Sequence, residues 1–194
     1  WSSFDNYEDI SLRTSKSKLI ESWDKIRTEY RSQIERYDDR QIEKIQQTIS
    51  KYENELVINT SSRLKADILL NLAILNEKLA NILLSRQNSS YMDYKRAALA
   101  QIAAIESSSF SSKKKDEALY LKATILTGIK DIKGALKSWK LLVSKKSNSK
   151  YSIYANIALG DYYFNNGENT RAKNFYLKAQ KIQNKLSNIE TQEK

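Results

Sequence analysis

The sequence predicts an all-α fold, and three observations support this prediction. The 194-residue chain contains no Pro, the residue that breaks helix interiors. It contains only four Gly, whereas an all-β chain needs Gly at its tight turns and bulges. Apolar residues recur at steps of three and four over long stretches, which is the pattern of one helix face. Long helices joined by short polar loops are therefore expected.

Residues 1–16 are polar and lack this periodicity, so they are expected to form a flexible lead-in. Residues 17–57 are expected to form one long helix, because neither Gly nor Pro marks a turn within them. A break near Asp38, where the phase of the apolar stripe slips, is the alternative. Two sets of residues follow the rhythm of a coiled coil: Leu19, Trp23, Ile26 and Tyr30, then Ile45, Ile49, Tyr52 and Leu56.

Two further helices are expected over residues 63–86 and 91–106. With the first helix they would form a long-helix bundle, residues 17–106. One possibility is a triple-helical bundle of the spectrin type. The other is a degenerate repeat, in which Ala80 and either Ala97 or Ala98 are the small residues at the helix contact. The Ser-rich segment 107–112 and the lysines at 113–115 are expected to form a linker.

Two helical hairpins are expected over residues 116–187, packed on the bundle. Their helices are predicted at 116–128 and 132–146, and at 151–165 and 169–187. Equivalent residues of the two hairpins lie 37 positions apart: Ala123 and Gly160, Ala135 and Ala172, Trp139 and Tyr176. The small residues allow the two helices of a hairpin to approach closely. The large aromatic residues are expected to fill the gap between successive hairpins.

This pattern resembles the tetratricopeptide repeat over residues 116–186, although the period is longer than usual and the Pro that ends each unit is missing. The resemblance implies protein–protein binding and no chemistry. It places a partner-binding groove on the first helix of each hairpin, at Glu117, Tyr120, Thr124, Thr127, Tyr154, Ile157, Asp161 and Phe164. The Lys, Arg and Asn clamp of chaperone-binding members is absent, so a chaperone cofactor role is not expected. Because these positions are aromatic and uncharged to mildly acidic, the expected occupant is a helix or extended segment of apolar or basic character. Helix 17–57 of the same chain is the alternative occupant.

Catalysis and cofactor binding are not expected. The chain contains neither His nor Cys, which removes His- or Cys-based zinc sites and catalytic triads. Acidic pairs such as Asp38–Asp39 fit helix ends or solvated surfaces better than catalytic dyads. No run of about 18 apolar residues was found that would span a membrane.

The charge of the chain is concentrated in its second part. Residues 1–60 carry 10 Lys and Arg against 12 Asp and Glu, whereas residues 61–194 carry 23 against 11. A basic surface is expected at Lys133, Lys137, Lys140, Lys173, Lys178 and Lys181. Its functional interpretation is the binding of polyanions such as anionic lipid, glycan or nucleic acid, and the favoured alternative is an ordinary solvated face of a Lys-rich chain. Nucleic acid is the least favoured of these, because no recognised motif accompanies the lysines.

The Lys-, Asn-, Ile- and Ser-rich composition without Pro or Cys resembles that of spirochaetal envelope lipoproteins. It is similar in particular to the helical N-terminal region of a periplasmic lipoprotein needed for cell fission and outer-membrane integrity. This resemblance implies a periplasmic or envelope location, with a cytoplasmic one as the alternative. Because the chain begins at Trp1, an upstream targeting segment or anchor that holds it near a membrane is expected. The sequence thus predicts a non-enzymatic scaffold that binds a protein partner and supports envelope integrity or cell division.

Overall fold

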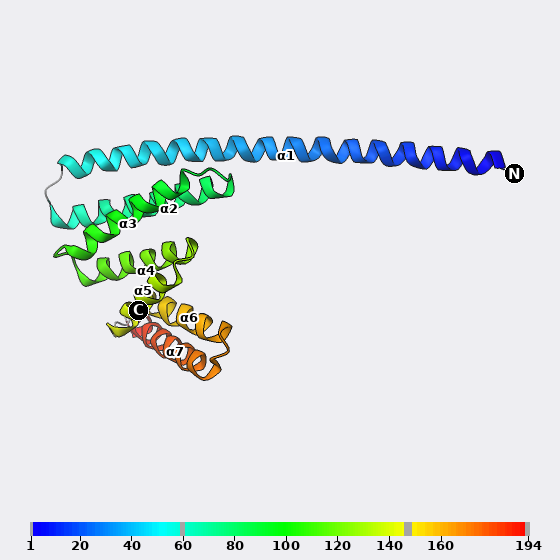
Figure 1. Cartoon of the computed structure of the whole chain (residues 1–194). Helices are drawn as coiled ribbons and strands as arrows, with labels where there is room; N and C mark the ends of the chain where they lie inside the picture. Colours follow the sequence, from blue (N-terminus) through cyan, green and yellow to red (C-terminus); the bar gives the residue numbers. More distant parts are fainter. Residues whose placement is uncertain (1, 59–60, 146–148, 193–194) are drawn as a thin grey trace. The chain divides into compact units, whose positions relative to one another are not determined.

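The computed structural model describes residues 2–58, 61–145 and 149–192, with only the backbone for residues 2–13 and 189–192. All seven helices of the described residues are α-helices, and these residues contain no strand, so the all-α prediction is confirmed (Figure 1). The chain divides into two units, residues 1–47 and residues 48–194. Each unit is described by itself.

The first unit is part of a single helix, α1, which runs from Ser2 to Ile58 and continues into the second unit. The prediction of one helix without a break near Asp38 is confirmed. Residues 2–16, which were expected to form a flexible lead-in, are helical and belong to α1. These residues lack an apolar stripe, but they also lack Pro and Gly, so nothing stops the helix from extending through them.

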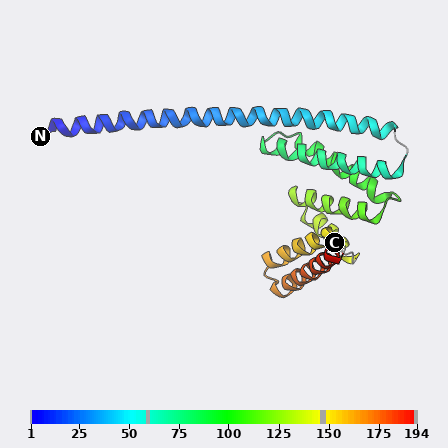
Figure 2. The ribbon, with the colours of Figure 1, turned by 180° about the vertical axis from the view of Figure 1, so that it is seen from behind.

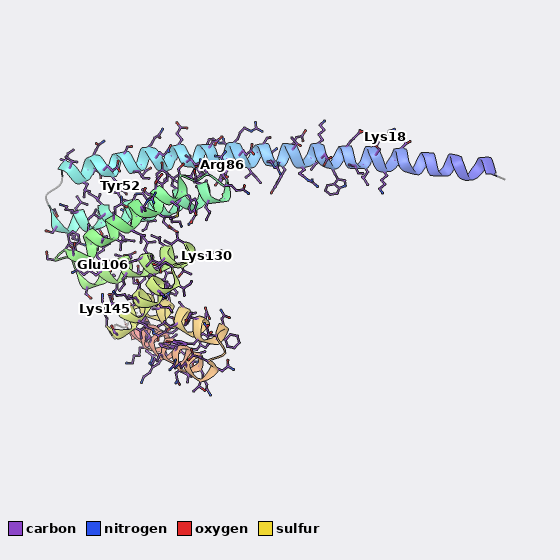
Figure 3. The ribbon with its side chains drawn as sticks, in the orientation of Figure 1. Lys18, Tyr52, Arg86, Glu106, Lys130 and Lys145 are labelled. Atoms are coloured by element: carbon purple, nitrogen blue, oxygen red, sulfur yellow. The ribbon has the colours of Figure 1, made fainter. Side chains whose placement is uncertain are left out.

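The second unit contains three helical hairpins (Figures 1 and 2). Their helices are α2 (Ser62–Ser85) and α3 (Tyr91–Ser107), α4 (Ser112–Gly128) and α5 (Ile132–Ser144), and α6 (Lys150–Asn165) and α7 (Asn169–Gln192). Successive hairpins contact each other through α3 and α4, and through α5 and α6. The end of α1, which carries Tyr52, belongs to this unit (Figure 3). Leu56 packs on the hydrophobic core that α2, α3 and α4 form, called here the first core, and Asn71 Nδ2 donates to Tyr52 Oη at 3.4 Å. The second core is formed by α4, α5 and α6.

The linker before α4 is shorter than the sequence predicts. Helix α4 begins at Ser112, so the three lysines at 113–115 lie in its first turns. Lys114 forms an ion pair with Asp67 of α2, which fixes this turn against the first hairpin. Two further ion pairs brace the stack: Lys122 Nζ lies 2.6 Å from Glu106, and Lys145 Nζ lies 2.7 Å from Asp116.

All three hairpins turn in the same way. The residue at the turn adopts a positive φ of 56° at Gln87, 64° at Lys130 and 76° at Gly167. In each case this residue and the next donate backbone hydrogen bonds to carbonyls three and five positions earlier, at distances of 2.8 to 3.0 Å. This is the hydrogen-bond pattern that closes a helix C-terminus with one left-handed residue. Only Gly167 adopts that conformation without strain.

Small buried residues recur at fixed positions around these turns. Ala80, Ala123 and Gly160 each lie seven residues before the turn residue and are buried. The second helices contribute Ala98, Ala135 and Ala172, which follow one another at intervals of 37 and are also buried. A side chain at Gly160 would overlap the ring of Tyr176 on α7. Small residues therefore set the close approach of the helices within each hairpin.

Large residues at the next position of the register differ in burial. Ile102 is fully buried in the first core, and Trp139 is buried between α4 and α6 in the second core. Tyr176, by contrast, is 36% exposed. It lies in the last hairpin of the described residues, where no further hairpin covers it.

Helix α2 is long and apolar enough to cross a membrane, judged by its length and composition alone. The sequence predicts this helix but not this property, because polar and charged residues interrupt its apolar residues. Half of its most apolar part is buried inside the structure, and its buried residues include Leu69, Leu70 and Ala73 of the first core. The apolar character of α2 therefore has a structural explanation, since it is a core helix.

Candidate partner-binding groove

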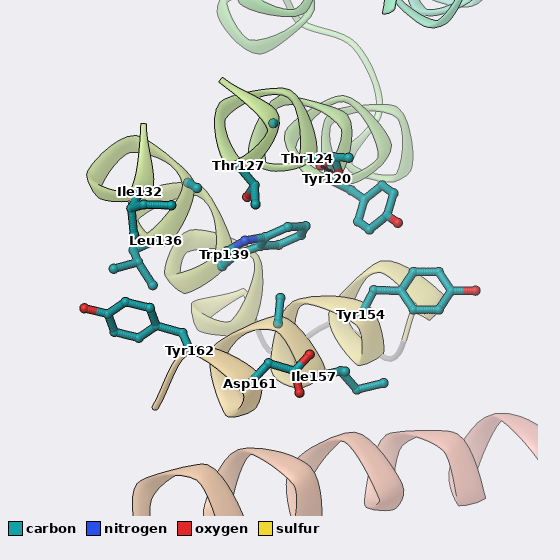
Figure 4. Close-up of a pocket in the computed structure, with 13 residues that line it drawn as sticks. Tyr120, Thr124, Thr127, Ile132, Leu136, Trp139, Tyr154, Ile157, Asp161 and Tyr162 are labelled. Carbon is teal, nitrogen blue, oxygen red and sulfur yellow. Dashed lines mark hydrogen bonds between the residues drawn. The ribbon is translucent and has the colours of Figure 1, made fainter. Parts of the chain in front are cut away.

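Helices α4, α5 and α6 line an open pocket of about 600 Å³ (Figure 4). Its floor contains Trp139, which projects from α5 between α4 and α6 (Figure 4). The lining is mainly apolar or aromatic, and it includes Ile132 and Leu136 on α5 and Ile157 on α6. We call this pocket the α4–α6 groove.

Tyr120 of α4 is the centre of an aromatic cluster that forms one wall of the groove. Its ring centroid lies 5.6 Å from that of Trp139, in an edge-to-face arrangement. The rings of Tyr151 and Tyr154 each lie 5.5 Å from it. Aromatic pairs at such separations stabilise each other beyond the burial of their area. Contacts within the chain itself therefore hold this wall in place.

The floor of the cluster is held by a buried phenol. Tyr151 is buried, and its hydroxyl donates a hydrogen bond to the Glu117 carboxylate. Burial raises the pKa of Tyr151 strongly, and the hydrogen bond and negative charge of Glu117 raise it further. Glu117, which the family resemblance placed in the groove, is thus a support behind the wall and is not among the residues that line the pocket.

Asp161 is the only charged residue in the lining of the groove. It is exposed, and it accepts a hydrogen bond of 2.7 Å from Tyr176 Oη. This bond raises the pKa of the Tyr176 phenol. The hydroxyls of Thr124 and Thr127 donate to carbonyls of their own helix, at 3.1 and 2.8 Å. The groove therefore offers an apolar surface with one negative charge.

The structure brings together six of the eight predicted groove residues. These are Tyr120, Thr124, Thr127, Tyr154, Ile157 and Asp161. Of the other two, Glu117 lies behind the aromatic wall, and Phe164 is 60% exposed and lines a separate hollow with Ala172 and Tyr176. Phe164 lies in the last turn of α6, beyond the reach of α5, so α7 supplies its neighbours instead.

Sequence reasoning missed the contribution of α5 to the groove. Ile132, Leu136 and Trp139 follow one another at steps of four and three, and all three line it. That spacing marks them as one helix face, but it does not reveal that the face is only partly covered by α6. Tyr162 is the other lining aromatic residue that was missed. It is half-buried, whereas Phe164 is exposed, because residues two positions apart lie on different faces of a helix.

The six lysines of the predicted basic surface are all exposed. None of them lines the groove, and none forms an ion pair with another described residue. Lys178 Nζ lies 5.1 Å from the centre of the Phe175 ring, a cation–π contact within α7. Lys133, Lys137 and Lys140 follow one another along the outer face of α5.

Metal ligands do not gather in the part of the chain that the structure describes. It holds no group of three or more Asp or Glu residues that could bind a metal ion, and the sequence has no His or Cys. Comparisons with protein families, with curated proteins and with solved structures find no match to this chain.

Proposed function

We propose that this chain is a non-enzymatic scaffold that binds a protein partner in the α4–α6 groove. The observation that carries the proposal is the exposure of apolar groups in a concave site. Tyr154 and Ile157 are 45% and 40% exposed there, beside the aromatic wall of Tyr120 and Trp139. A contiguous apolar patch on a soluble surface usually marks an interaction site.

The interpretation of the hairpins as tetratricopeptide-like units supports this proposal. Two features favour it: the shared turn geometry at Gln87, Lys130 and Gly167, and the recurring small residues beside each turn. The same features favour α2 and α3 as a third, degenerate unit over a spectrin-like bundle. A stack of such hairpins presents an extended concave surface to a partner.

The lining of the groove indicates what the partner offers. An amphipathic helix or an extended segment would place apolar side chains against Leu136, Trp139 and Ile157. A Lys or Arg at one end would reach the carboxylate of Asp161, where neighbouring aromatic faces add a cation–π contribution. An acidic segment would be repelled.

The cellular setting is a separate part of the proposal. The composition without Pro or Cys favours the bacterial envelope, where the scaffold would support envelope integrity or cell division. The test is fractionation of cells that carry the native gene, with the chain followed by antibody. Recovery in the cytoplasmic fraction would contradict the envelope location and would leave the groove untouched.

Site-specific photo-crosslinking tests the groove. A photoreactive phenylalanine analogue at Ile157 is expected to capture one defined partner in cells of the source organism. Leu141 is the matched control position, because it is 47% exposed on α5 and does not line the groove. Adding Leu136→Glu to the Ile157 probe is expected to abolish the adduct, since a carboxylate in the apolar wall repels an apolar segment.

Equal adducts from positions 157 and 141 would contradict groove binding. So would an adduct at 157 that survives Leu136→Glu with unchanged yield. The melting temperature of each variant, followed by circular dichroism, shows whether the fold persists.

A further inference from the structure

The first unit exposes an apolar stripe along one face of α1. It consists of six large residues, defined here as the α1 stripe: Leu19, Trp23, Ile26, Tyr30, Ile34 and Tyr37. Their exposed fractions range from 47% to 66%. Large apolar groups scattered singly over a surface need no explanation, but six on one helix face form a contiguous patch.

The spacing of the stripe keeps it nearly parallel to the helix axis. Its steps are four, three, four, four and three, so Leu19 and Tyr30, Trp23 and Ile34, and Ile26 and Tyr37 are each 11 residues apart. Eleven residues make three turns within about 20°, so the stripe hardly drifts around the helix. The stripe is about 27 Å long at 1.5 Å per residue. A second straight helix can follow it throughout.

The stripe is nearly symmetric about its midpoint at Thr28. Leu19 and Tyr37 lie nine residues from that point on either side, and Ile26 and Tyr30 lie two residues from it. Trp23 and Ile34 lie five and six residues from it. An antiparallel copy of α1 would therefore bring the stripe into register with itself.

Side-chain size favours this antiparallel register over a parallel one. In the antiparallel pair each aromatic residue faces an aliphatic one: Tyr37 faces Leu19, Trp23 faces Ile34, and Tyr30 faces Ile26. In a parallel pair Trp23 would face Trp23, and each Tyr would face its own equivalent. Helices pack closely when large residues face small ones.

Charge and area are also compatible with a second copy. Residues 14–47 carry eight Lys and Arg against seven Asp and Glu, with the signs interspersed, so two copies do not repel each other strongly. Helices that lie on membranes have a polar face dominated by Lys and Arg, which this one lacks. The six side chains expose roughly 100 Å² each, so a pair buries roughly 1,200 Å², the lower limit of a stable interface.

We propose that the α1 stripe binds the α1 stripe of a second copy of this chain, with the two helices antiparallel over residues 19–37. This pairing is independent of the α4–α6 groove, which belongs to the other unit. It would make the scaffold bivalent, since each dimer carries two grooves.

Sedimentation equilibrium of the full chain tests the pairing. The wild-type chain is expected to approach twice its monomer mass as its concentration rises from micromolar to submillimolar. Ile26→Glu is expected to weaken the dimer at least about 100-fold, because two buried carboxylates face the partner stripe. Thr28→Glu is the control, because it places the same charge only two residues along α1 from Ile26, on the face opposite the stripe.

Cysteine crosslinking tests the orientation, since the natural chain has no Cys. A mixture of Leu19→Cys and Tyr37→Cys chains is expected to form a disulfide dimer, whereas Leu19→Cys alone is not. The proposal is overturned if the wild-type chain stays monomeric. It is also overturned if Ile26→Glu and wild type dimerise equally while circular dichroism shows both to be helical. The antiparallel register is overturned if Leu19→Cys chains crosslink to one another and the mixture yields no disulfide between Leu19→Cys and Tyr37→Cys chains.

Discussion

Lys95 is the most thoroughly buried charged residue among those described. Its side chain on α3 is 2% exposed, and its Nζ lies 2.7 and 2.8 Å from the two carboxylate oxygens of Glu77 on α2. A third bond of 2.7 Å reaches Asn81 Oδ1. A buried ion pair contributes little net stability when complete, but removing one partner leaves an uncompensated charge.

Replacing Lys95 by Met is therefore expected to lower the free energy of unfolding by about 3 kcal/mol, since the mostly buried Glu77 carboxylate loses its cation and keeps only the hydrogen bond from Asn81 Nδ2. Replacing both residues, as Lys95→Met with Glu77→Leu, is expected to restore most of that loss. Urea unfolding of the four members of this double-mutant cycle measures the coupling. If the double variant loses as much as the two single variants added together, the pair does not act as described.

Tyr151 gives the protein a predictable sensitivity to alkali. Its pKa is raised above the ordinary value of about 10 for a phenol. The neutral phenol is the form that the fold stabilises, so its contribution is complete below about pH 10. That contribution is lost as the pH rises from there towards the pKa of the folded state.

Tyr151→Phe is therefore expected to cost about 1 kcal/mol at pH 8, where it removes only the hydrogen bond to Glu117. Above about pH 10 the difference from wild type is expected to shrink and then reverse, because Phe cannot ionise. Glu117→Gln, which removes the negative charge, is expected to make the alkaline loss shallower than in wild type. Parallel stability curves of wild type and Tyr151→Phe from pH 8 to 11 would contradict the assignment.

At the scale of helices, the close contact between α6 and α7 depends on the absence of a side chain at Gly160. A Cβ atom at Gly160 would lie 2.7 Å from Cδ1 and 2.9 Å from Cζ of Tyr176, well inside contact distance. Ala is a better helix former than Gly by about 1 kcal/mol. Propensity and packing therefore make opposite contributions at this position, and a substitution shows which is larger.

Gly160→Ala is expected to destabilise the wild-type chain by about 1 to 2 kcal/mol, since overpacking outweighs helix propensity. In a Tyr176→Ser background the same change is expected to be neutral or stabilising, because the ring is gone. Thermal unfolding of the four variants measures both effects. A stabilising Gly160→Ala in the presence of Tyr176 would show that the ring moves aside at little cost.

The sequence predicts which segments of this protein are helical better than it predicts where the helices end and which helices contact each other. The start of α2 at Ser62 and the turns between α2 and α3 and between α4 and α5 were predictable, because polar residues or Gly interrupt clear apolar stripes there. The helical state of residues 2–16 was not, since a helix can extend through polar residues that carry no stripe. The predicted linker extended four residues too far, through residues 112–115, because the pairing of Lys114 with Asp67 is a tertiary contact.

The groove residues on α4 and α6 were expected from the resemblance to the tetratricopeptide repeat, whereas the wall that α5 contributes was not. A repeat register identifies equivalent positions, but not which of them a neighbour covers. Trp139 and Tyr176 are equivalent in register, yet only Trp139 is followed by another hairpin. The burial of Lys95 was likewise unpredictable, because lysine is normally exposed and its acceptors lie on another helix.

At the scale of the whole molecule, two surfaces of different chemistry lie in the same unit. The α4–α6 groove is apolar with one carboxylate, whereas the lysines on α5 and α7 are exposed and cationic. Residues 61–194, which make up most of this unit, carry 23 Lys and Arg against 11 Asp and Glu, and such an excess of positive charge favours nonspecific association with polyanions. A partner captured at low salt does not by itself identify the surface that binds it.

Salt dependence separates the two surfaces. Contacts of the basic surface with a polyanion release counterions, so binding to heparin is expected to fall steeply between about 50 and 500 mM NaCl. Replacing Lys133, Lys137 and Lys140 by Gln is expected to make that dependence shallower by about two to three charges. Binding in the groove relies on apolar contact, which salt does not screen. The crosslink at Ile157 is therefore expected to keep its yield over the same range and in the triple variant. If its yield instead falls in parallel with heparin binding, and the triple variant abolishes it, the basic surface carries the function and the groove does not.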